Sequence, residues 1–142
     1  QPDDSPYPPI LTLNTLDGIT ELDGDGGPIN FVPFQVKHGN VSALGFRIGP
    51  LVYLPDVSEM SKEAWDEVKK AKCWILDALR RNPHPSHSHL ENSLEWIKKS
   101  RIEKAVLTNM HVDLDYETLM NETPKNVEPA FDGMVLDFEF AI

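Results

Sequence analysis

Histidine and aspartate residues that follow β-type segments give this sequence its clearest capacity for chemistry. His38 stands in the loop Lys37–Asn40, directly after a β-forming run, and Asp56 follows the apolar run 51–54. Imidazole is the commonest metal ligand among side chains, and a carboxylate can bridge two ions because each oxygen can bind one. Taken singly, each residue is also typical of an ordinary loop or turn cap, so both interpretations stay open.

Three of the five histidines lie close together in the chain. His84, His87 and His89 occur in segment 83–89, at the beginning of a predicted helix. The free N–H groups and partial positive charge of a helix N-terminus suit an anion such as phosphate. A histidine at this place could bind a metal, contact a phosphate or donate a proton to a leaving group. Chance clustering is the alternative.

A fourth polar segment, 108–116, leaves another predicted strand. Asn109 and His111 are two residues apart, so on an extended segment their side chains lie on the same side. Asp113 and Asp115 are either partners for imidazole N–H groups or loop caps. Together, the four segments place His38, then Asp56, then the histidines of 83–89 and finally His111 on loops after successive strands. This arrangement predicts a metal site.

The elements that must position these residues are predicted from apolar runs bounded by glycine and proline, and from helical spacing behind capping residues. Strands are predicted over 29–36, 41–48, 51–54, 73–79, 105–108 and 134–140. Helices are predicted from Ser61, from Ser88 to near Lys99, and over 116–122, while 21–27 is predicted to be a polar turn. Strands followed by strand–helix alternation indicate an α/β layered domain.

Composition narrows the class of protein. A chain of 142 residues, 40% of them hydrophobic, is long enough for one domain with a real core. Thirteen basic against 23 acidic residues give a net charge of −10, which disfavours long nucleic acid as a partner. No apolar run is long enough to span a membrane. The single cysteine, Cys73, excludes an internal disulfide framework and favours a reducing compartment, so we expect a cytoplasmic protein.

These four segments, together with two further segments between them, resemble the C-terminal half of a metallo-β-lactamase-fold hydrolase. The resemblance is strongest to the cyclic phosphodiesterase branch, which includes the phosphonate-operon enzyme and lies near the tRNA 3′-processing endonucleases of the RNase Z type. It extends from about Ser5 to Leu136. The segments that carry it are 34–39, 44–49, 53–59, 75–80, 84–87 and 107–116.

The resemblance implies one half of an αββα sandwich, a mixed sheet flanked by helices, and a two-metal phosphodiesterase that uses manganese or zinc. His38 would bind one ion, Asp56 would bridge both, and His87 would contact the scissile phosphate or donate a proton. Relatives place the second ion's histidine directly after the threonine, where this chain has Asn109. His111 is therefore the predicted replacement ligand.

The resemblance also implies substrate contacts from His84, His89 and Asn109, and a small phosphodiester or nucleotide as the ligand. The family's first metal motif, His-x-His-x-Asp-His, does not occur in the sequence. We therefore expect residues 1–142 to be the C-terminal half of the fold. They would need the N-terminal half, or a second copy, to cover the exposed sheet face and complete the site. The alternative is a non-catalytic nucleotide-binding or assembly module of the same fold.

Overall fold

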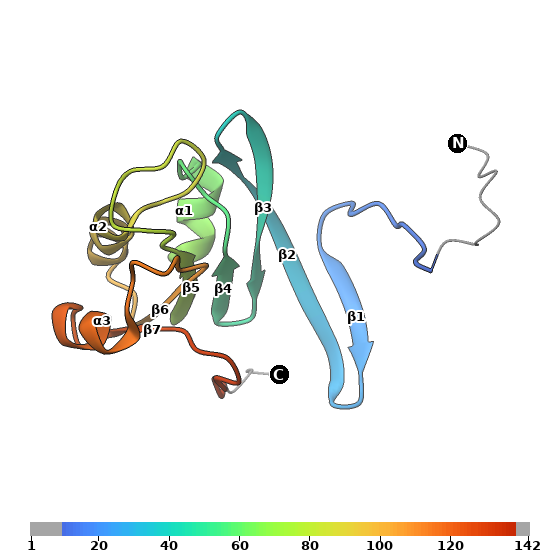
Figure 1. Ribbon diagram of the computed structural model, residues 1–142. Helices are drawn as coiled ribbons and strands as arrows, with labels where there is room; N and C mark the ends of the chain where they lie inside the picture. Colours follow the sequence, from blue (N-terminus) through green and yellow to red (C-terminus); the bar gives the residue numbers. More distant parts are fainter. Residues whose placement is uncertain (1–9, 139–142) are drawn as a thin grey trace.

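The structure, a computed structural model, describes residues 10–138, which build a seven-stranded sheet with three helices (Figure 1). The strands lie side by side in the order of the sequence. They are β1 (Thr20–Gly24), β2 (Gly27–His38), β3 (Val41–Ile48), β4 (Leu51–Leu54), β5 (Cys73–Asp77), β6 (Lys104–Thr108) and β7 (Val127–Pro129). The helices are α1 (Lys62–Val68), α2 (Leu90–Ser100) and α3 (Tyr116–Glu122).

Strand direction brings the site loops to one edge of the sheet. Neighbouring strands from β1 to β4 are antiparallel, and those from β4 to β7 are parallel. Because β3 runs opposite to both of its neighbours, β2 points the same way as β4, β5 and β6. The carboxyl ends of these four strands therefore share an edge, and so do the loops that leave them. The mixed sheet with helices confirms the predicted α/β class.

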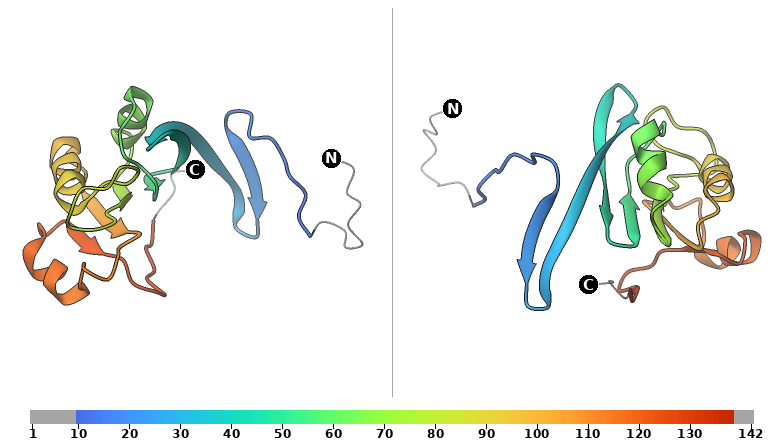
Figure 2. Two further views of the ribbon diagram at one scale, coloured as in Figure 1. Left: turned by 45° about the horizontal axis from the view of Figure 1, so that its top comes forward. Right: turned by 180° about the vertical axis from the view of Figure 1, so that it is seen from behind.

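All three helices lie on one face of the sheet (Figure 2). Each connects two neighbouring parallel strands, and the connections progress in one direction across the sheet, so right-handed crossovers place them on the same side. The alternate residues of β4 and β5 that face the helices, such as Val52, Leu54 and Leu76, are fully buried. The ring of Trp74 on β5 meets that of Trp65 on α1 edge to face at 6.1 Å.

The opposite face of the sheet is apolar and much less covered. Leu44 on β3 and Tyr53 on β4 are 39% and 42% exposed, and the cross-strand pair Leu22 and Ile29 at the β1–β2 end is also exposed. Strand register places these side chains on the face without helices. Contiguous exposed apolar surface of this kind marks an interaction face.

An ionic cluster fastens α1 to β3. Nε of Arg47 lies 2.6 Å from Oε2 of Glu67, and Nζ of Lys70 lies 2.6 Å from Oε1 of the same carboxylate, whose side chain is 12% exposed. Burial alone would raise the pKa of Glu67, but the hydrogen bonds from Lys70 and Arg47 outweigh it and hold the pKa below its ordinary value.

Several predicted boundaries need correction. Residues 134–138 form no strand, and the rest of the predicted strand 134–140 lies outside the described residues. The last strand is instead β7, because the chain returns through α3 to pair in parallel with β6. Segment 21–27 is not only a turn, since it forms most of β1 and the tight connection to β2.

Two further boundaries differ around the histidine-rich segment. β5 ends at Asp77 rather than at residue 79. His89, rather than Ser88, is the N-cap of α2. The Ser88 hydroxyl is buried and lies 2.7 Å from that of Ser93 instead of capping the helix. Within the described residues, no helix combines the length and apolar character needed to cross a bilayer.

Candidate metal centre

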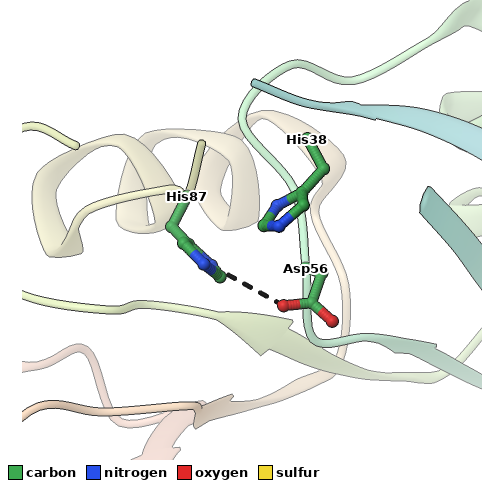
Figure 3. Close-up of side chains that lie close together, drawn as sticks. All are labelled: His38, Asp56 and His87. Atoms are coloured by element: carbon green, nitrogen blue, oxygen red, sulfur yellow. Dashed lines mark ion pairs between the residues drawn. The ribbon is translucent and has the colours of Figure 1, made fainter. Parts of the chain in front are cut away.

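Three side chains from different loops meet at the edge where β2, β4 and β5 end (Figure 3). His38 is the last residue of β2, Asp56 follows β4, and His87 lies between β5 and α2. One ligand atom from each lies within 4.8 Å of those of the other two, and all three residues are half-buried. Nδ1 of His87 is 3.7 Å from Oδ1 of Asp56. The rings of His87 and His38 meet edge to face, with 4.5 Å between their centroids. One metal ion could bind all three.

Backbone contacts fix the loop that carries Asp56 against the end of β2. The N–H of Ser58 donates to the carbonyl of Lys37 at 2.8 Å, and the Ser58 hydroxyl accepts the N–H of Gly39 at 3.0 Å. Gly39 has a φ of 62°, a left-handed conformation that favours glycine. A Cβ atom at Gly39 would lie 3.0 Å from Cβ of Ser86. The histidine-rich loop therefore packs directly on this turn.

Asp77, a buried carboxylate that the sequence analysis did not single out, lies behind the three side chains. Its Oδ2 accepts hydrogen bonds from the N–H of Val57 at 3.2 Å and from Nδ1 of His87 at 2.8 Å. Its Oδ1 accepts one from Nδ2 of Asn109 at 3.3 Å. Burial raises the pKa of the Asp77 carboxyl, and the hydrogen bonds from His87 and Val57 oppose that rise. An acidic residue ending the apolar run 73–76 was the available sequence signal.

The contact with Asp77 sets the tautomer of His87. An ionised carboxylate only accepts hydrogen bonds, so Nδ1 of His87 carries the shared proton. Nδ2 of Asn109 also lies 3.3 Å from this nitrogen, but its amide protons have acceptors in Asp77 and in the carbonyl of Pro55. Nε2 is therefore the atom that His87 offers to an ion, a phosphate or a leaving group. A carboxylate behind an imidazole in this way fixes the orientation of the ring.

The donor set fits a divalent transition metal. Two imidazoles and a carboxylate are ligands that suit both zinc and manganese. Nδ1 of His38 is buried and has no hydrogen-bond partner among residues 10–138. A buried nitrogen without a partner is costly unless something binds it, and a metal ion would do so.

The structure separates the two residues considered for the second ion. Asn109, with a φ of 60°, bonds to Asp77 and so joins the site from behind. His111 is exposed, and its Nδ1 lies 3.4 Å from Oδ1 of Asp113. It is outside the group of three potential ligands found among the described residues, and its role as a metal ligand stays a prediction. Asp115 takes the alternative role, because its side chain caps α3.

The other two predicted substrate-binding histidines differ in position. The centroid of the His84 ring is 5.3 Å from that of the His87 ring, so His84 lies beside the metal centre. Partial burial and nearby positive charge lower the pKa of His84. His89 is the N-cap residue of α2 without a side-chain capping bond, and it is outside the group of three potential ligands.

Comparison with known proteins decides the family. Residues 3–110 match the family described as Beta-lactamase superfamily domain. The chain belongs to the metallo-β-lactamase superfamily. A diphosphatase from the PhnP family has a similar structure, with a TM-score of 0.82 and 31% identity over 90% of this chain and 49% of that one. The resemblance to this superfamily is thereby confirmed.

More distant metallo-β-lactamase structures share the fold. Human tRNase Z, short form, gives a TM-score of 0.58 at 20% identity, covering 79% of this chain and 44% of that one. Zinc-bound PqqB from Methylobacterium extorquens gives 0.66 at 14% identity, covering 88% and 55%. An octanoyltransferase from Porphyromonas gingivalis is 25% identical over 133 residues, which are 92% of this chain and 27% of that protein. The chain thus spans about half the length of the solved structures and a smaller part of this curated relative.

Proposed function

We propose that this chain is part of a metal-dependent phosphoesterase that hydrolyses small, nucleotide-like phosphodiesters or diphosphates. The observation that carries the proposal is the meeting of His38, Asp56 and His87 within 4.8 Å at one edge of the sheet. The 31% identity to a PhnP-family diphosphatase supports phosphate chemistry. The net charge of −10 argues against long nucleic acid as substrate.

His38 and Asp56 are the residues that would hold the metal, and Asp56 would bridge two ions. His111 remains the predicted ligand of the second ion. Zinc and manganese both suit these nitrogen and oxygen donors. When bound, such ions activate water and neutralise the charge of the phosphoryl group.

His87 is the proposed proton donor to the leaving oxygen, a role that requires the doubly protonated ring, in which Nδ1–H bonds to Asp77 and Nε2–H carries the proton that is donated. Its Nδ1 is held by the buried carboxylate of Asp77 at 2.8 Å, which leaves Nε2 to face the substrate. A general acid must lie within hydrogen-bond reach of the atom it protonates, and a ring held from behind keeps that reach without reorganisation. Asn109 donates a hydrogen bond to the same carboxylate. We propose that it helps to hold Asp77 and that it also contacts the substrate.

The proposed enzyme needs a second half. Leu44 and Tyr53 leave an apolar sheet face exposed, and the three potential ligands are too few for two ions. We propose that the N-terminal half of the fold, which would carry the missing His-x-His-x-Asp-His motif, covers this face, with a second copy of the chain as the alternative. The buried free thiol of Cys73 is compatible with the cytoplasm.

The test is the change Asp56→Ala in the protein assembled with its companion half. Hydrolysis of bis(p-nitrophenyl) phosphate should fall by more than about tenfold, because the bridging carboxylate is lost. Glu103→Ala, at an exposed carboxylate that precedes β6 and lies outside the group of three ligands, is the control and should retain activity. Activity of Asp56→Ala within tenfold of wild type would end the bridging role. Nucleotide binding that is insensitive to EDTA, without hydrolysis, would instead favour the non-catalytic module.

A further inference from the structure

His84 lies beside the metal centre without being one of its three potential ligands. Its ring centroid is 5.3 Å from that of His87, whose ring in turn meets that of His38 at 4.5 Å. The His87 ring therefore has two imidazole neighbours, those of His38 and His84. His84 is thus close enough to the centre to contact a group next to a reacting phosphate.

The hydrogen bonds of His84 fix which nitrogen carries its proton. Nδ1 accepts the backbone N–H of Ser86 at 3.3 Å and lies 3.2 Å from the Ser86 hydroxyl. A backbone amide can only donate, so Nδ1 presents its lone pair and the proton of the neutral ring resides on Nε2. Protonating Nδ1 would set two donors against each other. Within residues 10–138, the hydrogen bonds of this ring all use Nδ1, which leaves the Nε2–H group available as a donor.

The loop that carries His84 is held in place from both sides. Nε of Arg80 donates to the carbonyl of Asn82 at 3.1 Å, and its Nη2 donates to that of Pro83 at 2.7 Å. On the other side, Ser86 packs on Gly39 of the β2–β3 turn. A donor on so constrained a loop binds its ligand with little loss of conformational entropy. Arg80 also brings a positive charge to the loop in an otherwise acidic protein.

We propose that His84 is a specificity-determining residue whose Nε2–H binds the non-reacting phosphoryl group of a diphosphate substrate. This inference rests on the proposed function and narrows its substrate class. In a diphosphate, the second phosphorus lies one bridging oxygen beyond the first. A phosphoryl group attacked among His38, Asp56 and His87 would therefore have its neighbour within reach of His84, whose ring centroid lies 5.3 Å from that of His87. A simple phosphodiester has no such second anionic group.

Two substitutions separate ligand binding from support of the loop. His84→Gln keeps an amide donor at the position of Nε2 but loses the acceptor for Ser86. His84→Asn keeps an acceptor near the position of Nδ1 but loses the outer donor. Both variants are assayed in the metal-loaded protein with its companion half. The substrates are diadenosine diphosphate and bis(p-nitrophenyl) phosphate.

His84→Asn should raise KM for the diphosphate by about tenfold or more, since a hydrogen bond to a charged group is lost. Its KM for bis(p-nitrophenyl) phosphate should stay within about twofold of wild type, and His84→Gln should recover much of the diphosphate affinity. Rescue by Asn instead of Gln would overturn the inference in favour of loop support. So would equal losses on both substrates, or a wild type that hydrolyses only the phosphodiester. A wild type that hydrolyses neither substrate would overturn the proposed function as well.

Discussion

Removing the carboxylate of Asp77 should destabilise the protein and loosen its metal centre together. Asp77 is fully buried, and its Oδ2 accepts hydrogen bonds from the N–H of Val57 and from Nδ1 of His87. Val57 follows Asp56 directly, so one oxygen holds the loop of the proposed bridging carboxylate and the ring of the proposed proton donor. Its other oxygen accepts a hydrogen bond from the side-chain amide of the exposed Asn109.

The magnitude follows from which donors lose their acceptor. In Asp77→Ala, the buried N–H of Val57 and the Nδ1–H of His87 are both left unpaired, at about 1–3 kcal/mol each, offset in part by the relief of a desolvated carboxylate. We expect a net loss of about 2–4 kcal/mol in the free energy of unfolding. Asp77→Asn can keep its oxygen toward these two donors, and its amide nitrogen would then require the exposed Asn109 amide to rotate and present its oxygen. It should therefore cost less, about 1–2 kcal/mol.

The assay is urea unfolding of the metal-free protein, followed by zinc titration of the folded variants. Glu103→Gln is the control, since Glu103 is an exposed carboxylate that precedes β6, at the end of the strand away from the site, and it should leave both readouts unchanged. Loss of a carboxylate behind a ligating or catalytic histidine typically lowers metal affinity or activity by about 10–100-fold. The reasoning is refuted if Asp77→Ala is as stable as wild type, or if Asp77→Asn is the more damaging change.

Two further predictions concern the scaffold. Because the pKa of Glu67 is lowered from an ordinary 4.5, its carboxylate stabilises the fold above that pH, and the contribution is lost as the pH falls through the lower folded value. Glu67→Gln should lower the free energy of unfolding by about 1 kcal/mol near neutral pH and flatten the acid side of a curve of stability against pH. The control Glu103→Gln, at an exposed carboxylate, should have neither effect. A Glu67→Gln variant whose acid side is unchanged would contradict the prediction. Gly45→Ala should lower the free energy of unfolding by about 1–3 kcal/mol, measured by thermal unfolding, because the new Cβ would overlap ring atoms of the buried Phe34. Gly26→Ala has open space around its Cβ, and equal stability of the two variants would contradict the packing argument.

The parallel part of the fold could be read from the sequence because its short apolar strands and capped helices carry strong local signals. Together with the strands predicted before them, these signals placed His38, Asp56 and His87 on loops after successive strands, from which the metal site was predicted. The strand predicted over 134–140 rested on alternation alone. Alternation does not reveal that α3 returns the chain to β6 at residues 127–129, which is a matter of tertiary pairing.

Asp77 and His111 show where sequence reasoning about the site ends. Asp77 was absorbed into an apolar strand prediction, and only its burial beside His87 reveals its role. His111 and Asn109 share a side in an ideal extended segment, but the left-handed conformation of Asn109 breaks that alternation. Asn109 turns toward Asp77, while His111 lies beside Asp113. A single residue with positive φ is difficult to foresee, because it depends on the contacts of the finished fold.

The most direct test of the account is a native mass spectrum of the protein titrated with zinc, alone and with its companion half. The account predicts an ion bound weakly by the chain alone, lost in the double variant His38→Ala and Asp56→Ala, and two ions in the assembled protein. His111→Ala, measured in parallel, should remove the second ion and leave the first. Zinc binding that survives the double variant unchanged, or an assembled protein that binds no zinc or manganese, would contradict the central claim.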